Sequence, residues 1–371
     1  MSAQPQPASP ARLAAARAVV EEAIAARAFP GAAWGILHNG EVTVDSAGRF
    51  TYDDASPAVT PATVFDLASV TKVVVTTALA MLLYDRRMLS LDALLGDILP
   101  GFIIGMAPGS QKRRVTLRSL LAHSSGLPGY VPLFEQHHTP AAMLRAALQV
   151  TLEADPNTRA EYSDIGFILL GKALEVLSGE ILSGLFAREV AAPLGLQTAT
   201  FCPPPAARPH IPPTEDDTTF RHRILQGEVQ DENCYALGSV AGHAGLFANA
   251  HDVLRFAACI LAEGRTASGR QLFQADTVRL FATRQSTPAG TTRALGWDTP
   301  STPSSSGSHF SPSSIGHLGY AGTSLWIDPT RNLAVVLLTN RTWPSRNRPD
   351  GSSDLIKQVR PAFHDALATD L

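Results

Sequence analysis

The chain has 371 residues, of which 45% are hydrophobic and 17% charged, which suits a globular protein with a sizeable core. A formal net charge of -3 gives no electrostatic footprint for nucleic acid, so we expect no such partner. The three cysteines are widely spaced and form no CxxC pair, which favours a reducing compartment over a disulfide framework.

No secretory signal is evident at the N-terminus, and the longest apolar stretch, residues 73–84, is too short to span a bilayer. We therefore expect a soluble, cytoplasmic protein without membrane contact. The sequence does not indicate an oligomeric state.

The N-terminal part predicts a tail, a helix and a hairpin. Residues 1–9 are rich in Ala, Pro, Ser and Gln and predict a flexible tail. Ser9 and Pro10 are typical of a helix start, and the helix should continue to Arg27. Two β-type runs then flank Asn39-Gly40, a dipeptide that favours a hairpin turn.

The middle of the chain predicts helices, over residues 69–86, 140–152 and 165–177. The proline-rich segment 201–217 predicts an irregular surface connection. A further helix is expected over 251–263, where Asn249 and Asp252 resemble a capping box.

Strands return near the C-terminus. Residues 317–329 and 333–341 predict a hairpin whose second strand is buried, and the last helix, from about Asp354, contains Pro361 and should kink there. Residues 301–314 form a low-complexity loop, and the sequence leaves open whether it gates a site. Strands at both ends thus predict an α/β lobe, about 10–68 and 250–371, with a helical lobe, about 69–249, inserted.

Ser69 and Lys72 form the first candidate catalytic pair. Their spacing places both side chains on one helix face, and this is the sole S-x-x-K among only four lysines. A serine hydroxyl needs a base to become a nucleophile, and a lysine among valines loses hydration, which lowers its pKa. Alone, the pair is also compatible with an ordinary helix start.

Two further elements carry candidate site residues. Tyr162 directly precedes an apolar helix and could relay a proton, while Asp164 could cap that helix. His317 and Gly319 open a predicted strand, and Gly319 and Gly322 would let a ligand approach the backbone. The alternatives are that Tyr162 only packs in the core and that His317 is a half-exposed strand residue without a catalytic role.

Together, SVTK, YSD and HLG resemble the S-x-x-K, Y-x-N and K-T-G or H-x-G motifs of the serine β-lactamase and penicillin-binding protein superfamily. The class C β-lactamases and family VIII carboxylesterases are the nearest groups. LRSLLAHSSGLPGY, PLGL and the segment AGHAGLFANAHDVLRF are similar to further segments of that superfamily. The resemblance covers about residues 10–345 and implies a serine β-lactamase-like α/β fold, an antiparallel sheet flanked by helices plus the inserted helical lobe.

The resemblance also implies roles. Ser69 would be the nucleophile, Lys72 its proton acceptor and Tyr162 the partner acid and base. The backbone N–H groups of Ser69 and Tyr320 would form the oxyanion hole, and His317 and Gly319 would contact substrate. Asp164 replaces the usual asparagine; it adds negative charge near Lys72, which puts the substrate class in doubt.

No metal or cofactor is expected. His137 and His138 lack the helical H-x-x-x-H spacing of a zinc site, and no dinucleotide or phosphate-binding glycine motif occurs. The polar segment QDENCY, residues 230–235, and His243 could line a cleft, although turn roles are equally compatible.

We therefore predict a serine hydrolase that forms an acyl-enzyme, most simply a carboxylesterase on small esters or amides. A D-aminoacyl peptidase, a DD-carboxypeptidase or a weak β-lactamase, for example in cell-wall fragment recycling, is the alternative, and a catalytically slow sensor or scaffold is another. A histidine with a pKa of about 6.5 would be mostly neutral above pH ~7. Preference for carboxylate-bearing substrates over neutral esters should then rise as the pH falls.

Overall fold

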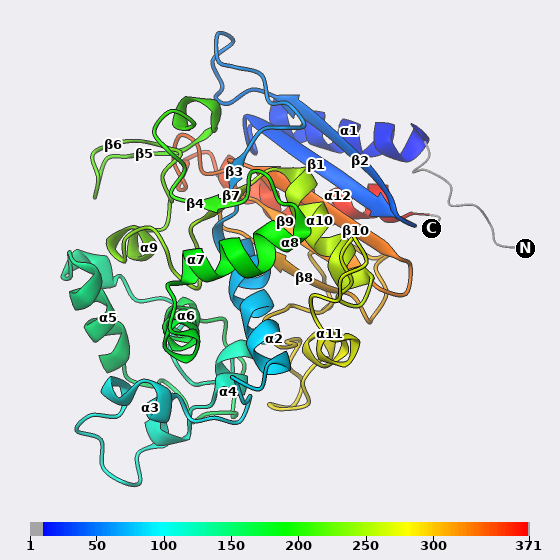
Figure 1. The fold of residues 1–371 in the computed structure, drawn as a ribbon. Helices are drawn as coiled ribbons and strands as arrows, with labels where there is room; N and C mark the ends of the chain where they lie inside the picture. Colours follow the sequence, from blue (N-terminus) through cyan, green and yellow to red (C-terminus); the bar gives the residue numbers. More distant parts are fainter. Residues whose placement is uncertain (1–9, 370–371) are drawn as a thin grey trace, which may run out of the picture.

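The structure is a computed structural model that describes residues 10–369, with side chains from Leu13 onward. The predicted tail, residues 1–9, lies outside this range. At the centre is an antiparallel sheet with strand order β2-β1-β10-β9-β8, built from both ends of the chain (Figure 1). Its strands are β1 (Gly31–His38), β2 (Glu41–Gly48), β8 (Ile315–Leu318), β9 (Ser324–Asp328) and β10 (Leu333–Thr339).

The predicted hairpin at Asn39-Gly40 is confirmed. The strands β1 and β2 pair from His38 opposite Glu41 to Gly31 opposite Gly48. Asn39 and Gly40 both have positive φ, 51° and 86°, as a two-residue turn with the right twist requires.

Helices cover both faces of the sheet. Because side chains alternate along a strand, Trp34 and Ile36 pack with α1 (Pro10–Ala25) and α12 (Ile356–Ala368), while Ala33 and Leu37 pack with α10 (Ala250–Leu261). The last helix starts two residues later than expected and continues through Pro361.

The inserted middle of the chain is mainly helical and lies to one side of the sheet (Figure 1). The predicted helices at 140–152 and 165–177 are confirmed as α5 and α6. The α-helices of the chain beyond those already named are α2 (Ala78–Asp85), α3 (Leu95–Ile98), α4 (Leu117–Leu121), α5 (Pro140–Gln149), α6 (Asp164–Ser178), α7 (Leu182–Phe186), α8 (Ala192–Leu194), α9 (Glu232–Ala236) and α11 (Ala275–Ala282).

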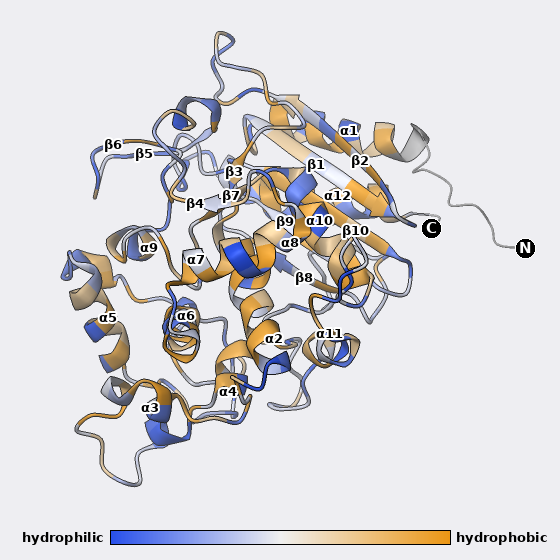
Figure 2. Ribbon diagram, in the orientation of Figure 1, coloured by the Kyte–Doolittle hydropathy of each residue, from blue (hydrophilic) through white to orange (hydrophobic). Residues whose placement is uncertain are grey.

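The helical run Ala68–Asp85 passes through the centre of the molecule. Instead of one uniform helix it has a 3₁₀ turn, η1 (Ala68–Val70), a π segment, η2 (Lys72–Thr77), and then α2. Its length and composition would suffice to cross a membrane, but 83% of it is buried inside the protein. It is therefore a core helix, and Figure 2 shows its apolar character.

The expectation of an irregular surface segment over 201–217 is wrong at both ends. Phe201 belongs to β4 (Thr200–Phe201), in a small sheet with β7 (Leu246–Ala248) and β3 (Phe65–Asp66). β5 (Pro213–Asp217) pairs with β6 (Arg223–Gln226) and is mostly buried. The sequence did not predict this strand, because prolines favour a loop, although an edge strand or the first residue of a strand tolerates them.

Candidate active site

Ser69 lies in the 3₁₀ turn that follows β3, behind a strained residue. Ala68 has φ of 47°, a left-handed conformation that is costly for a residue with a side chain. The Asp66 carboxylate accepts hydrogen bonds from the Ala68 and Gln230 N–H groups, each at 2.8 Å. These bonds fix the turn that presents Ser69 to the cavity.

Lys72 is fully buried, and its Nζ atom donates to three acceptors. They are Ser69 Oγ at 3.0 Å, Asp164 Oδ1 at 2.6 Å and the His243 carbonyl at 3.0 Å. Burial lowers the pKa of Lys72, and the Asp164 carboxylate opposes this shift without cancelling it. The predicted contact between Ser69 and Lys72 is therefore present, with a lysine that loses its proton more readily than usual.

Tyr162 approaches the same serine. Its hydroxyl donates to Ser69 Oγ at 2.7 Å. Burial and the nearby Asp164 carboxylate raise its pKa well above the ordinary value, so the phenol keeps its proton. Two basic groups lie over its ring, Lys72 Nζ at 4.8 Å and Arg293 Cζ at 5.7 Å from the ring centre, and in their protonated forms they would stabilise negative charge on the phenol oxygen.

His123 holds Tyr162 in place, a role that sequence reasoning missed. Its ring lies between Tyr162 and Phe167, with centroid distances of 4.8 and 4.9 Å, and its Nδ1 accepts the Ser163 N–H at 3.0 Å. Burial, with Arg293 next, lowers the pKa of His123 and keeps it neutral. The segment LRSLLAHSSGLPGY contained this residue, but nothing in the sequence indicated what the ring would contact.

His317 and Gly319 occupy less open positions than expected. His317 is 2% exposed, its ring lies 5.9 Å from that of Tyr162, and its Nδ1 pairs with the Leu318 carbonyl at 2.7 Å. Neither residue lines the cavity, whereas Asp164 and Tyr320 do.

The glycines were expected to admit a ligand, but the protein itself fills the space beside them. A Cβ at Gly319 would lie 1.9 Å from Thr323 Oγ1 and 2.7 Å from the Leu67 carbonyl, and one at Gly322 would lie 2.0 Å from Thr339 Oγ1. Glycine at position 319 therefore lets the β8–β9 connection approach the chain that carries Ser69.

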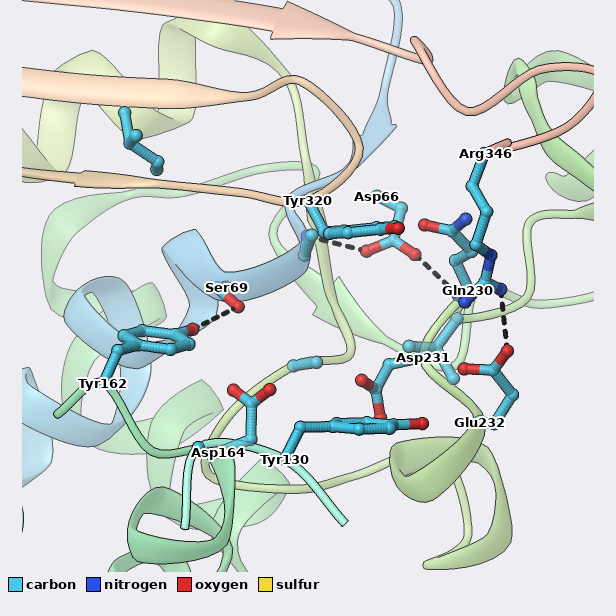
Figure 3. A pocket seen from close by; sticks show the side chains of 15 residues that line it. Asp66, Ser69, Tyr130, Tyr162, Asp164, Gln230, Asp231, Glu232, Tyr320 and Arg346 are labelled. Atoms are coloured by element: carbon cyan, nitrogen blue, oxygen red, sulfur yellow. Dashed lines mark hydrogen bonds and ion pairs between the residues drawn. The ribbon is translucent and has the colours of Figure 1, made fainter. Parts of the chain in front are cut away.

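A cavity of about 530 Å³ opens beside Ser69 (Figure 3). As the sequence suggested, Gln230, Asp231 and Glu232 line it; Tyr130 and Arg346 were not foreseen. The full lining is Asp66, Ala68, Ser69, Gly129, Tyr130, Tyr162, Asp164, Val229, Gln230, Asp231, Glu232, Ala244, Leu318, Tyr320 and Arg346.

Three of the four carboxylates that line the cavity contact a basic side chain, and the fourth, Asp66, contacts backbone N–H groups. Asp164 binds Lys72, Arg346 binds Glu232 at 2.7 Å as well as Glu215, and Asp231 accepts from His243 Nε2 at 2.8 Å. His243 thus supports the cavity wall, with its carbonyl on Lys72. Over residues 10–369, no group of three or more His, Cys, Asp or Glu residues could hold a metal ion.

A serine hydroxyl between a buried lysine and a tyrosine, in a cavity beside an antiparallel sheet, is an arrangement suited to acyl transfer through serine. Residues 16–356 match the Beta-lactamase family, and the chain belongs to this family of serine hydrolases. The resemblance, the fold class and the assignment as an enzyme are thereby confirmed.

Three known proteins illustrate the range of this family. The N-acetylmuramyl-L-alanine amidase of Bacillus subtilis (strain 168) is 32% identical over 358 residues, covering 87% of this chain and 79% of the amidase. A putative D-alanyl-D-alanine carboxypeptidase of Escherichia coli (strain K12) is 32% identical over 310 residues, covering 76% of this chain and 70% of the carboxypeptidase. The crystal structure of a class C beta lactamase from Rhodobacter sphaeroides has a TM-score of 0.70 at 23% identity, covering 95% of this chain and 98% of the beta lactamase.

Proposed function

We propose that this hydrolase acts through a covalent acyl-enzyme on Ser69. Neutral Lys72 takes the proton from Ser69 Oγ as the oxygen attacks the substrate carbonyl carbon. Support comes from the 3.0 Å contact between the two groups and from the burial that lowers the pKa of Lys72. The developing oxyanion would be received by the backbone N–H groups of Ser69 and Tyr320.

Tyr162 completes the proton path. Its phenol gives a proton to the leaving nitrogen or oxygen as the carbonyl–leaving-group bond breaks, and the proton held by Lys72 then restores the phenol. The 2.7 Å bond to Ser69 Oγ supports this role, as do Arg293 and the protonated Lys72 formed in the first step, which lie over the ring. In the second half-reaction water gives a proton to the same pair, attacks the acyl carbon and releases the acid and Ser69.

For the substrate, we propose an uncharged amide of a cell-wall fragment, with small esters hydrolysed as well. One observation carries this choice: among the described residues that line the cavity, the only Lys or Arg is Arg346, which two carboxylates already neutralise. A carboxypeptidase must hold a terminal carboxylate next to the scissile bond, and this lining offers it no free cation. The amidase relative is therefore the better guide than the carboxypeptidase relative, and amides take precedence over the simple esters favoured from the sequence.

The test is a panel of four substrates with wild-type protein and Ser69→Ala. N-acetylmuramyl-L-alaninamide, p-nitrophenyl acetate, a D-alanyl-D-alanine peptide and nitrocefin would be compared by kcat/KM. We expect the amide and the ester to be turned over, and the peptide and nitrocefin to be poor substrates. Ser69→Ala should lose the acyl adduct seen by mass spectrometry and several orders of magnitude in rate.

Retained turnover in Ser69→Ala would refute the nucleophile assignment, and a preference for the D-alanyl-D-alanine peptide would refute the substrate assignment. A sensor or scaffold would leave Ser69 unlabelled by a fluorophosphonate in the wild-type protein. We also keep a cytoplasmic location as a proposal, supported by three cysteines that form no disulfide; cell fractionation tests it.

A further inference from the structure

Two tyrosines face the cavity from opposite sides. Tyr130 is 47% exposed and Tyr320 is 50% exposed, and Figure 3 shows their rings on either side of the space that extends from Ser69. Large side chains with half their surface open are ordinary when scattered over a surface, but here both line one cavity. Apolar ring faces that line an open cavity indicate a ligand with an apolar surface to cover them.

Tyr320 is held from behind. The Arg341 guanidinium lies 4.6 Å from the Tyr320 ring centre, and its Nε donates to the Tyr320 carbonyl at 2.7 Å. A ring fixed in this way loses little conformational freedom when a ligand stacks on it. Tyr130 comes from the loop that follows α4 and Tyr320 from the connection between β8 and β9. The two rings are thus far apart in the sequence and line the same cavity only in the folded protein.

The polar groups beyond the tyrosines are mostly acceptors. Gln230 donates its side-chain N–H to Glu215, which leaves its carbonyl oxygen for a ligand. Glu232 adds carboxylate oxygens at the side of the cavity away from Ser69, and Asp231 adds others between Glu232 and Asp164 (Figure 3). Such a lining matches a ligand that carries several hydroxyl or amide donors.

From the two aromatic faces and this acceptor-rich end, we propose that Tyr130 and Tyr320 form a subsite for a sugar ring of the substrate. A pyranose presents C–H groups on its faces and hydroxyl donors around its rim, so it satisfies the rings and the acceptors at once. This inference rests on the proposed function, because it assigns where the sugar of a muramyl amide would bind relative to Ser69.

An ammonium group is the competing ligand, since carboxylates and tyrosine faces also bind cations. The position of Arg346 favours the sugar. Glu215 and Glu232 already bind Arg346, whose guanidinium lies 5.7 Å from the Tyr320 ring centre, so an ammonium on that ring would meet a fixed positive charge. Hydroxyl donors can share those carboxylates without adding charge.

The experiment compares two amides that differ only by the sugar. N-acetylmuramyl-L-alaninamide and D-lactoyl-L-alaninamide share the scissile bond, and the ratio of their kcat/KM values reports the subsite. We expect Tyr130→Leu and Tyr320→Leu each to lower this ratio about tenfold through lost stacking. Tyr130→Phe, which keeps the ring, should retain most of it.

Tyr52→Leu is the matched control, because Tyr52 does not line the cavity; its ratio should equal that of the wild type. Unchanged ratios in both leucine variants would overturn the subsite. A D-alanyl-L-alaninamide preferred over the muramyl amide, with a preference lost in the leucine variants, would assign the tyrosines to an ammonium instead.

Failure of the proposed function is a separate outcome, seen as no hydrolysis of either amide. The subsite is then decided by calorimetric binding of N-acetylglucosamine to Ser69→Ala and to Ser69→Ala combined with Tyr130→Leu. Weaker binding in the second protein supports the sugar subsite, and equal binding or none overturns it.

Discussion

Two buried ion pairs lie close to the cavity and differ in whether their hydrogen bonds offset the effect of burial on the charge. Arg221 and Asp217 are 2% and 3% exposed, and Asp217 also accepts the Phe220 and Arg221 N–H groups. The remaining Arg221 donors reach the carbonyls of Val229 and Gln230, at 2.6 Å each. This pair braces the segment that forms one wall of the cavity.

The Lys72–Asp164 pair is shorter, 2.6 Å against 2.9 Å, but lies against the open cavity. Lys72 is fully buried, Asp164 retains 16% exposure, and the third group of the cluster is the Ser69 hydroxyl. Burial disfavours the charge in both pairs. At Asp217 the hydrogen bonds outweigh the effect of burial and lower the pKa, which favours the charged carboxylate. At Lys72 the effect of burial prevails and also lowers the pKa, which favours the neutral amine.

The difference separates a structural pair from a reactive one. A structural pair holds both charges firmly, because breaking it exposes an uncompensated charge in the interior. A reactive pair leaves one partner close to losing its proton, and a third group is present to exchange it. Geometry alone, a short contact between opposite charges, does not distinguish them.

The largest expected effect concerns activity at the reactive pair. Lys72→Ala and Tyr162→Phe should each lower kcat/KM about 10²- to 10⁴-fold, the range for a positioned acid or base. Because both act on one Ser69 proton, the double variant should be little worse than the poorer single variant. Losses that add in log rate, measured with one neutral ester, would show two independent roles.

The next effect concerns stability at the structural pair. Arg221→Met should lower the free energy of unfolding by about 3–5 kcal/mol, since it leaves Asp217 buried and charged. Lys72→Met is the matched variant, and it should cost less because water in the cavity can solvate Asp164. Denaturant unfolding of both proteins makes the comparison, and equal losses would remove the distinction between the two pairs.

A smaller effect is a shift in the pH profile. Lys72 must be neutral to act as a base, so kcat/KM falls as the pH drops through its pKa. Asp164 raises that pKa against the effect of burial, and Asp164→Asn should therefore move the acidic limb to lower pH. Profiles of both proteins with a neutral ester test this, and a shift to higher pH would contradict it.

Motif spacing predicted the chemistry at Ser69 better than it predicted the surroundings. Ser69 and Lys72 are three residues apart, so local geometry alone brings them together. Tyr162 needed the family resemblance, because it is 93 residues from Ser69 and no local rule links them. The position of Asp164 beside Lys72 was foreseen only as added negative charge nearby.

The walls of the site depended on tertiary packing. Tyr130 and Arg346 come from two separate segments, and their own sequence contexts indicate only loops. The same holds for β5, whose prolines predicted a loop although pairing with β6 made it a strand. Burial was the other property that the sequence did not show, and it lowers the pKa values of His123 and His317.

His317 illustrates that last point and gives the smallest expected effect. An exposed histidine would gain charge as the pH falls from about 8 to about 6, and preference for carboxylate-bearing esters over neutral ones would rise. Burial, with Lys72 next, instead lowers the pKa of His317 well below the ordinary value. His317→Gln should therefore leave the pH dependence of this preference unchanged.

Asp66 is a cavity-lining group that titrates at the lower end of that window, because burial raises its pKa to about 6. Its protonation removes part of a negative charge near the substrate, so preference for the carboxylate-bearing ester should rise about twofold between pH 8 and 6. Asp66→Asn should abolish this rise, whereas His317→Gln should retain it. Since both esters share the titration of Lys72 and Tyr162, the ratio of their kcat/KM values cancels it. A rise lost in His317→Gln and kept in Asp66→Asn would return the role to the histidine.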